Sequence, residues 1–258
     1  MKIEKLLIIP EYNDLDRYMK LVKQYDCGFE YNDFFLPNVL DNDEICQQKI
    51  EGYGKQELPS WCTMHGAFLD VTIFSDDARI REVSDLRVEQ SLIIAAKLGV
   101  KGVVFHTNYV ANFLQDAYRE GWVAKNAAYW KEKLARYPGL MIYMENMFDS
   151  DWELLAKLGE RMQDEPRFGV CFDYAHAHVF GNPERIDEWV KALSPYIKHV
   201  HINDNDFVSD LHLPVGAGRI DWQHFKRLYQ EYMSKASVLI EVKGVEAIEQ
   251  SLQALQAL

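Results

Sequence analysis

The sequence predicts an α/β protein in which eight strands alternate with helices and close into one (β/α)8 barrel, a single domain covering residues 1–258. Short apolar runs and helical patterns alternate about eight times, which is typical of a parallel sheet with crossover helices. The length of 258 residues is the usual size of such a barrel. A doubly wound open sheet is the alternative, but it usually has fewer strands and a recognisable ligand loop.

The predicted elements follow in order along the chain. The strands are expected at residues 6–10, 28–31, 61–68, 100–105, 140–144, 168–172, 197–202 and 238–240. The helices are expected at residues 15–25, 41–50, 77–98, 124–137, 151–162, 183–193, 221–232 and 245–258. In the longest helix, four apolar residues are spaced to form the apolar face of an amphipathic helix: Val83, Leu86, Ile93 and Ala96. Segments 37–59 and 108–123 are less regular, and we expect loops there over the same end of the barrel.

Composition limits the partners and the compartment. With 28 basic and 40 acidic residues, the net charge is −12. Such a chain has no general electrostatic attraction to nucleic acid or anionic membranes, so we expect neither as a partner. Four cysteines without a CxxC pair indicate free thiols in a reducing compartment. Without a signal-peptide pattern or a membrane-spanning stretch, we expect a cytoplasmic protein; the sequence leaves open whether it forms a homo-oligomer.

The densest group of polar side chains is in residues 198–222, KHVHINDNDFVSDLHLPVGAGRIDW. Burying these acids, amides and imidazoles without partners would be costly, and a bound metal would explain them. Histidine and carboxylate together suit zinc, manganese or a similar cation. In barrels of this class the chemistry is at the C-terminal ends of the strands. The ligand-type residues expected there are His65, His106, Glu145, Asp173, His176, His201, Asp210, His212 and Glu241.

The concentration of histidines supports a metal site. Five of the eight histidines are in this set, although any single histidine is more often an ordinary core or surface residue. His199 faces the same way as His201 but one layer deeper, so we interpret it as structural. We interpret His178 and His224 as ordinary loop and helix residues.

At these positions the sequence resembles the xylose isomerase-like barrels, a superfamily of sugar isomerases and epimerases that also contains endonuclease IV. The resemblance covers nearly the whole chain and is carried by the segments MHGAF, VFHTN, YMEN, CFDYAHAH, HVHINDND, DLHLPVGAGRIDW and LIEVKG. It implies one divalent metal (Mn, Zn, Mg or Co) held by Glu145, Asp173, His201 and Glu241. The remaining residues are then expected to bind substrate or additional metal: His65, His106, His176, Asp210 and His212.

The resemblance implies a metal-dependent isomerase or epimerase of a small sugar or sugar phosphate, an activity of carbohydrate metabolism. A metal at the sugar carbonyl acidifies the neighbouring C–H bond and stabilises an enediolate. Glu145 and Glu241, on strands roughly opposite each other, are expected to remove and return the proton. Phe207 stands where ketose 3-epimerases have a substrate-binding arginine, and Asp151 where they have a glutamate. These two departures argue against a simple free ketose.

Endonuclease IV provides the alternative function, a zinc phosphodiesterase acting at abasic sites. Its three-zinc site uses all nine positions of the set, which favours phosphoester hydrolysis. Three features argue against it: ENMFDSD replaces a glycine-rich stretch, no arginine- and lysine-rich DNA loop is evident, and the charge of −12 is unfavourable for a duplex binder. A barrel that binds a sugar without converting it is a third hypothesis, which the full set of ligand-type residues disfavours.

Overall fold

The computed structural model describes residues 1–57 and 59–258. Eight parallel strands close into a barrel in chain order, and the last strand pairs with the first. The strands are β1 (Leu6–Ile8), β2 (Gly28–Tyr31), β3 (Cys62–His65), β4 (Gly102–His106), β5 (Met141–Glu145), β6 (Phe168–Asp173), β7 (Ile197–Ile202) and β8 (Ser237–Ile240). The predicted (β/α)8 barrel is therefore confirmed.

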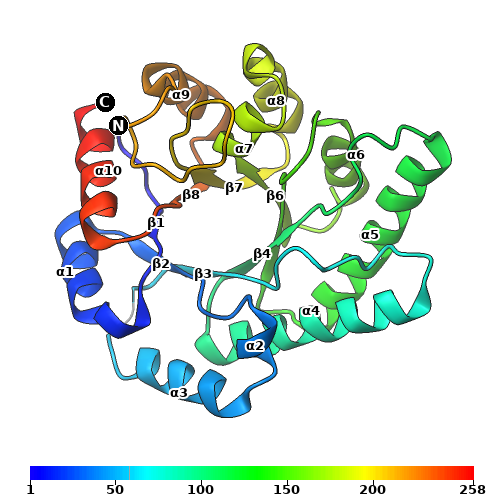
Figure 1. Ribbon diagram of the computed structural model, residues 1–258, viewed down its shortest axis with the longest axis horizontal. Helices are drawn as coiled ribbons and strands as arrows, with labels where there is room; N and C mark the ends of the chain where they lie inside the picture. Colours follow the sequence, from blue (N-terminus) through cyan, green and yellow to red (C-terminus); the bar gives the residue numbers. More distant parts are fainter. Residues whose placement is uncertain (58) are drawn as a thin grey trace.

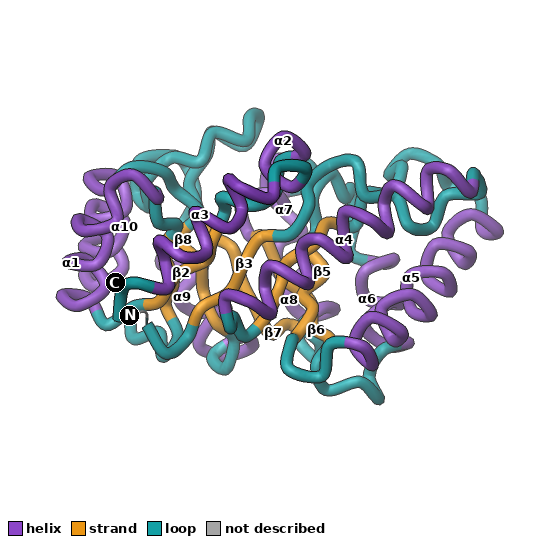
Figure 2. Tube along the Cα trace, turned by 90° about the horizontal axis from the view of Figure 1, so that it is seen from below, coloured by secondary structure: helices purple, strands orange, loops and turns teal. Residues whose placement is uncertain are grey.

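Helices surround the strands, as Figures 1 and 2 show from two directions. They are α1 (Leu15–Tyr25), α2 (Pro37–Leu40), α3 (Asp43–Gly54), α4 (Ala78–Leu98), α5 (Asp116–Arg136), α6 (Glu153–Arg161), α7 (Tyr174–Val179), α8 (Ile186–Leu193), α9 (Trp222–Leu228) and α10 (Val245–Ala257). The two ends of the chain meet, since the amino group of Met1 donates a 2.7 Å hydrogen bond to the carbonyl of Leu255. Among the described residues, no helix is long and apolar enough to cross a membrane.

The strands are buried on both faces because the barrel interior covers one face and the helices cover the other. Every residue of β6 is buried, as are the last four of β7. Successive residues of a strand alternate between these two faces. The parallel direction of all eight strands brings their C-terminal ends to one end of the barrel, where the polar residues that follow them gather.

The prediction of which face α4 buries is wrong. Val83, Leu86 and Ile93 are 54%, 51% and 45% exposed, respectively. The helix instead buries a face that contains small polar residues. There, the hydroxyl oxygens of Ser84 and Ser91 accept hydrogen bonds from backbone N–H groups of the loop after β3. A pattern based on hydrophobicity alone does not predict hydrogen bonds of this kind.

Two other expectations about the helices also need correction. Helix α5 begins at Asp116 rather than at residue 124, so the loop expected at 108–123 is partly helical. Gly121 lowers the helix propensity of this part of the sequence, but Trp122 packs in the core and fixes it there. Helix α7 was not predicted; Asp173 caps it by accepting a hydrogen bond from the backbone N–H of His176 at 2.6 Å.

Candidate metal centre

The nine predicted site residues all lie at the C-terminal end of the barrel, where they form three neighbouring clusters. The clusters are His65, His106 and Glu145; His176, Asp210 and His212; and Glu145, Asp173, His201 and Glu241. Within each cluster, one ligand atom from every residue lies within 4.8 Å of the others. Glu145 belongs to two of them.

In the four-residue cluster, Glu145, Asp173 and His201 are fully buried and Glu241 is partly buried. Nδ1 of His201 lies 3.5 Å from Oε1 of Glu145 and 3.4 Å from Oε2 of Glu241. Burial raises the pKa of Asp173, and the carboxylates of Glu241 and Glu145 raise it further. Ionised carboxylates can only accept hydrogen bonds. Three of them around one imidazole therefore require a cation or protons between them.

In the second cluster, two imidazoles face each other. Nε2 of His65 lies 3.1 Å from Nε2 of His106, and these atoms lie 3.6 and 3.5 Å from Oε2 of Glu145. Nδ1 of His65 lies 2.9 Å from the carbonyl oxygen of Gly66 and donates to it. In the neutral ring, Nε2 then carries a lone pair that is available to a cation.

The third cluster joins the start of α7 to the loop after β7. Nε2 of His176 and Nε2 of His212 lie 3.4 and 3.1 Å from Oδ2 of Asp210. Nδ1 of His176 donates to the carbonyl of Asn146 at 3.0 Å, and Nδ1 of His212 donates to that of Glu241 at 2.9 Å. Both rings thus present Nε2 to the same place, an orientation typical of ligating histidines.

The donor atoms fit a divalent cation because many of them have no other partner. Among the described residues, the site atoms that are buried without a hydrogen bond include both carboxylate oxygens of Glu145, Oδ2 of Asp173, Nε2 of His176, Nδ1 of His201, Oδ1 of Asp210 and Oε2 of Glu241. Burying unpaired polar atoms is costly. Imidazole and carboxylate donors suit zinc or manganese, so bound cations would remove this cost.

Without a cation, protons take part of this role. Burial lowers the pKa of His212, but the carboxylates of Glu241 and Asp210 outweigh it and raise the pKa to about 10. The pKa of His176 is likewise raised despite burial, chiefly by Asp173 and by its contact with Asp210. In the metal-free site, His176 and His212 are therefore imidazolium groups paired with carboxylates.

The clusters open onto a cavity of about 360 Å³, a size suited to a small molecule. Several residues that line it are not among the predicted site residues, and these include Asn32, Phe35, Phe68 and Lys243. Phe35 and Phe68 are half-buried, with ring centroids 5.4 Å apart. Lys243 is the only lysine or arginine among the described lining residues. Each of these four lining residues follows a strand by a few positions, and only that place in the sequence could have predicted its role in the cavity.

The three histidines outside the predicted site have structural roles. His199 lies one layer below it, as expected, with Nδ1 2.7 Å from the hydroxyl oxygen of Ser237. His178 is within α7 and not in a loop, and its Nδ1 donates to the carbonyl of Tyr174 at 2.7 Å. His224 pairs with Asp187 at 2.8 Å on the surface.

Residues 23–258 match the family model described as the xylose isomerase-like TIM barrel. The chain belongs to this family. The matched residues include seven of the eight strands, β2 to β8, and all nine clustered positions. Membership shows the fold and a family composed largely of enzymes, which include epimerases, isomerases and endonuclease IV.

Two relatives within this family illustrate its range. The uncharacterized protein MJ1311 of Methanocaldococcus jannaschii is 26% identical over 201 residues, which cover 75% of this chain and 68% of that protein. A probable endonuclease 4 of Mycobacterium leprae is 27% identical over 172 residues, which cover 61% of this chain and 64% of that protein.

Solved structures share the fold over nearly the whole chain. The TTHB071 protein of Thermus thermophilus, soaked with ZnCl2, aligns with a TM-score of 0.72 and 24% identity, covering 99% of this chain and 98% of that one. A D-tagatose 3-epimerase-like protein aligns with a TM-score of 0.76 and 22% identity, covering 98% and 96%. At these identities the similarity shows the fold alone.

Proposed function

We propose that the protein is a divalent-metal-dependent enzyme that hydrolyses a phosphoester of a small sugar phosphate. The observation that carries this proposal is the position of Glu145 between two clusters. Its Oε2 faces His65 and His106 at 3.6 and 3.5 Å, and its Oε1 faces His176 and His201 at 3.4 and 3.5 Å. A carboxylate between neighbouring cation positions is an arrangement suited to multi-metal phosphatases and nucleases.

The residues around the cavity would bind and orient the substrate. A divalent cation supplies Lewis-acid polarisation of a phosphoryl oxygen. The ammonium group of Lys243 would bind an anionic oxygen of the ester, and Phe35 and Phe68 would pack on the sugar, while water supplies the attacking oxygen. The small cavity and the net charge of −12 favour a small ester over duplex nucleic acid.

A sugar isomerase or epimerase is the second candidate, and the position of Glu241 favours it. Glu241 lines the cavity, as a residue that transfers a substrate proton must. This mechanism would use Glu145 and Glu241 to move a proton through an enediolate of the sugar. Glu145, however, is fully buried and is not a cavity-lining residue. Its environment suits a shared ligand better than a base, so we rank hydrolysis above the isomerase or epimerase activity that the sequence favours.

One assay separates these activities. Protein loaded with zinc or manganese is incubated with sugar phosphates, free ketoses and an abasic-site oligonucleotide, with and without a chelator. We expect inorganic phosphate from a sugar phosphate, lost on chelation, and no new sugar isomer. New isomers without phosphate release would establish the second candidate instead. Cleavage of the oligonucleotide alone would show that the substrate is nucleic acid.

A further inference from the structure

A layer of polar side chains is buried in the barrel interior beneath the metal-ligand clusters. It contains Glu30 from β2, Thr63 from β3, His199 from β7 and Ser237 from β8, each at most 1% exposed. A carboxylate at this depth is costly to bury unless it is paired and hydrogen-bonded. None of these residues reaches the cavity, so their role must be exerted through a neighbour.

One oxygen of Glu30 is fixed by this layer. Oε2 accepts hydrogen bonds from the hydroxyl of Thr63 at 2.7 Å and from Nε2 of His199 at 3.0 Å. Because an ionised carboxylate can only accept, Nε2 of His199 carries the proton. Nδ1 of a neutral His199 then accepts from the hydroxyl of Ser237 at 2.7 Å. The orientation of the Glu30 carboxylate is therefore set by side chains of three other strands.

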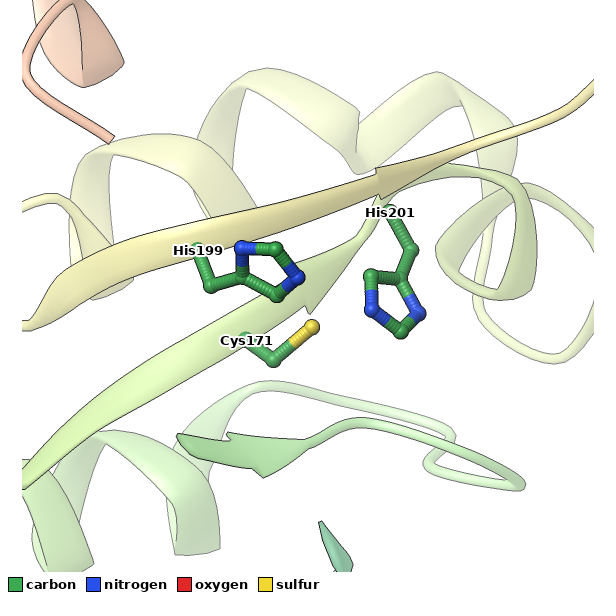
Figure 3. Close-up of side chains that lie close together, drawn as sticks. All are labelled: Cys171, His199 and His201. Atoms are coloured by element: carbon green, nitrogen blue, oxygen red, sulfur yellow. The ribbon is translucent and has the colours of Figure 1, made fainter. Parts of the chain in front are cut away.

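The other oxygen of Glu30 faces a predicted metal ligand. Oε1 lies 3.2 Å from Nε2 of His201, an ion-pair distance, and neither atom has a hydrogen bond to any other group among the described residues. Figure 3 shows His199 and His201 projecting from the same side of β7, with Cys171 of β6 beside them. The opposite nitrogen of His201, Nδ1, faces Glu145 and Glu241.

We propose that Glu30 is the positioning residue of the four-residue cluster. It holds the Nε2–H of His201, so that Nδ1 presents its lone pair toward a cation shared with Glu145 and Glu241. A carboxylate behind a ligating histidine fixes the tautomer and the ring orientation. The inference rests on the cation of the proposed function, but it does not depend on which reaction the cation serves.

The same layer offers another arrangement, in which Cys171, His199 and His201 would themselves hold a cation. Their ligand atoms lie within 4.8 Å of one another. Both ring nitrogens of His199 are already engaged, with Ser237 and Glu30, and Nε2 of His201 faces Glu30. The geometry therefore assigns this layer to orientation and not to binding. Cation content that falls in Cys171→Ala would contradict this assignment.

The first test measures zinc affinity in metal-free wild type and in Glu30→Gln by calorimetric titration. We expect affinity at the most affected site to fall about 10- to 100-fold, the usual effect of losing such a partner. Asp149→Asn is the matched control, because it makes the same change at a buried carboxylate that accepts from Thr107 and the backbone of Met147 and, within the described residues, bonds no imidazole. Equal affinity in wild type and Glu30→Gln would overturn the proposal.

The second test needs no substitution and so does not depend on whether Glu30→Gln folds. Long-range ¹H–¹⁵N spectra of zinc-loaded wild type report which nitrogen of His201 carries the proton. We expect a protonated Nε2 and a zinc-shifted Nδ1; the opposite pattern would refute the role of Glu30. Failure to hydrolyse any phosphoester would reject the proposed function without changing either result, so the two failures are distinguishable.

Discussion

Oε1 of Glu145 lies 3.5 Å from Nδ1 of His201, and neither atom has a hydrogen bond in the described part of the chain. The other oxygen of Glu145 belongs to a different cluster, whereas Glu241 contributes to only one. We therefore expect Glu145→Gln to lose more bound cation than Glu241→Gln, as measured by elemental analysis of both variants. Proton transfer would give a different result: similar, moderate losses of cation and a fall in turnover of roughly 10²–10⁴-fold in each.

Replacing Lys243 should weaken the binding of phosphorylated ligands more than that of unphosphorylated ligands. Its ammonium group is the only non-histidine cation among the described residues that line the cavity. Loss of a charge-assisted hydrogen bond should raise KM for the phosphorylated substrate about 10-fold or more in Lys243→Ala. Lys235→Ala is the control, because Lys235 lines a different surface hollow. An unchanged KM would show that the substrate is not held by Lys243.

Cation binding should depend on pH. In the metal-free protein, the pKa of His212 is raised to about 10 by Glu241 and Asp210, against the effect of burial. A proton therefore competes with the cation at neutral pH. We expect protons to be released on binding and affinity to rise between pH 6 and about 9, where competition weakens. Zinc titration in weakly buffered solution with a pH indicator measures both; binding without proton release would contradict the assignment.

The same shift affects the stability of the metal-free protein. A histidine whose folded pKa is above its unfolded value stabilises the fold fully below the unfolded pKa of 6.5, and this contribution is lost as pH rises through about 10. Chemical unfolding of metal-free wild type and His212→Ala should therefore differ most at low pH and converge at high pH. A difference that is constant with pH would argue against the ion pairs of His212.

Asp149 should also make the stability fall as pH rises, but through a buried neutral acid and not through a buried cation. Burial raises the pKa of this carboxyl from 3.8 to about 7, although bonds from Thr107 and Met147 lower it. The folded state keeps a proton that the unfolded state releases, so the free energy of unfolding should fall between pH 4 and 7, by up to about 1.4 kcal/mol per pH unit. Asp149→Asn should remove this component. Denaturant unfolding of both proteins across this range is the measurement; parallel curves would contradict the shift.

The barrel and the nine clustered residues could be predicted because both follow from position along the chain. Parallel strands place their C-terminal ends together, so a polar residue at the end of each strand is enough to locate the site. His65 and Asp210 are far apart in sequence, yet this rule brings them to the same end. The sharing of Glu145 between clusters could not be predicted, because it depends on side-chain orientation.

The position of Glu30 shows why the polar layer beneath the clusters could not be predicted from the sequence. In a strand with one solvent-exposed face, a glutamate between Phe29 and Tyr31 would point to water. In a closed barrel both faces are buried, so the same alternation directs Glu30 inward. Its partner His199, which in turn bonds Ser237, comes from the C-terminal part of the sequence, and only closure of the barrel brings it to Glu30.

Cation content per chain tests the account most directly. Wild type, His212→Ala and the surface control His224→Ala are loaded with zinc, freed of excess and analysed for bound metal. Three neighbouring clusters predict more than one cation per chain in wild type, a loss of about one in His212→Ala, and no change in His224→Ala. A content of one per chain that His212→Ala leaves unchanged would contradict the multi-cation centre and favour a single-metal isomerase or epimerase.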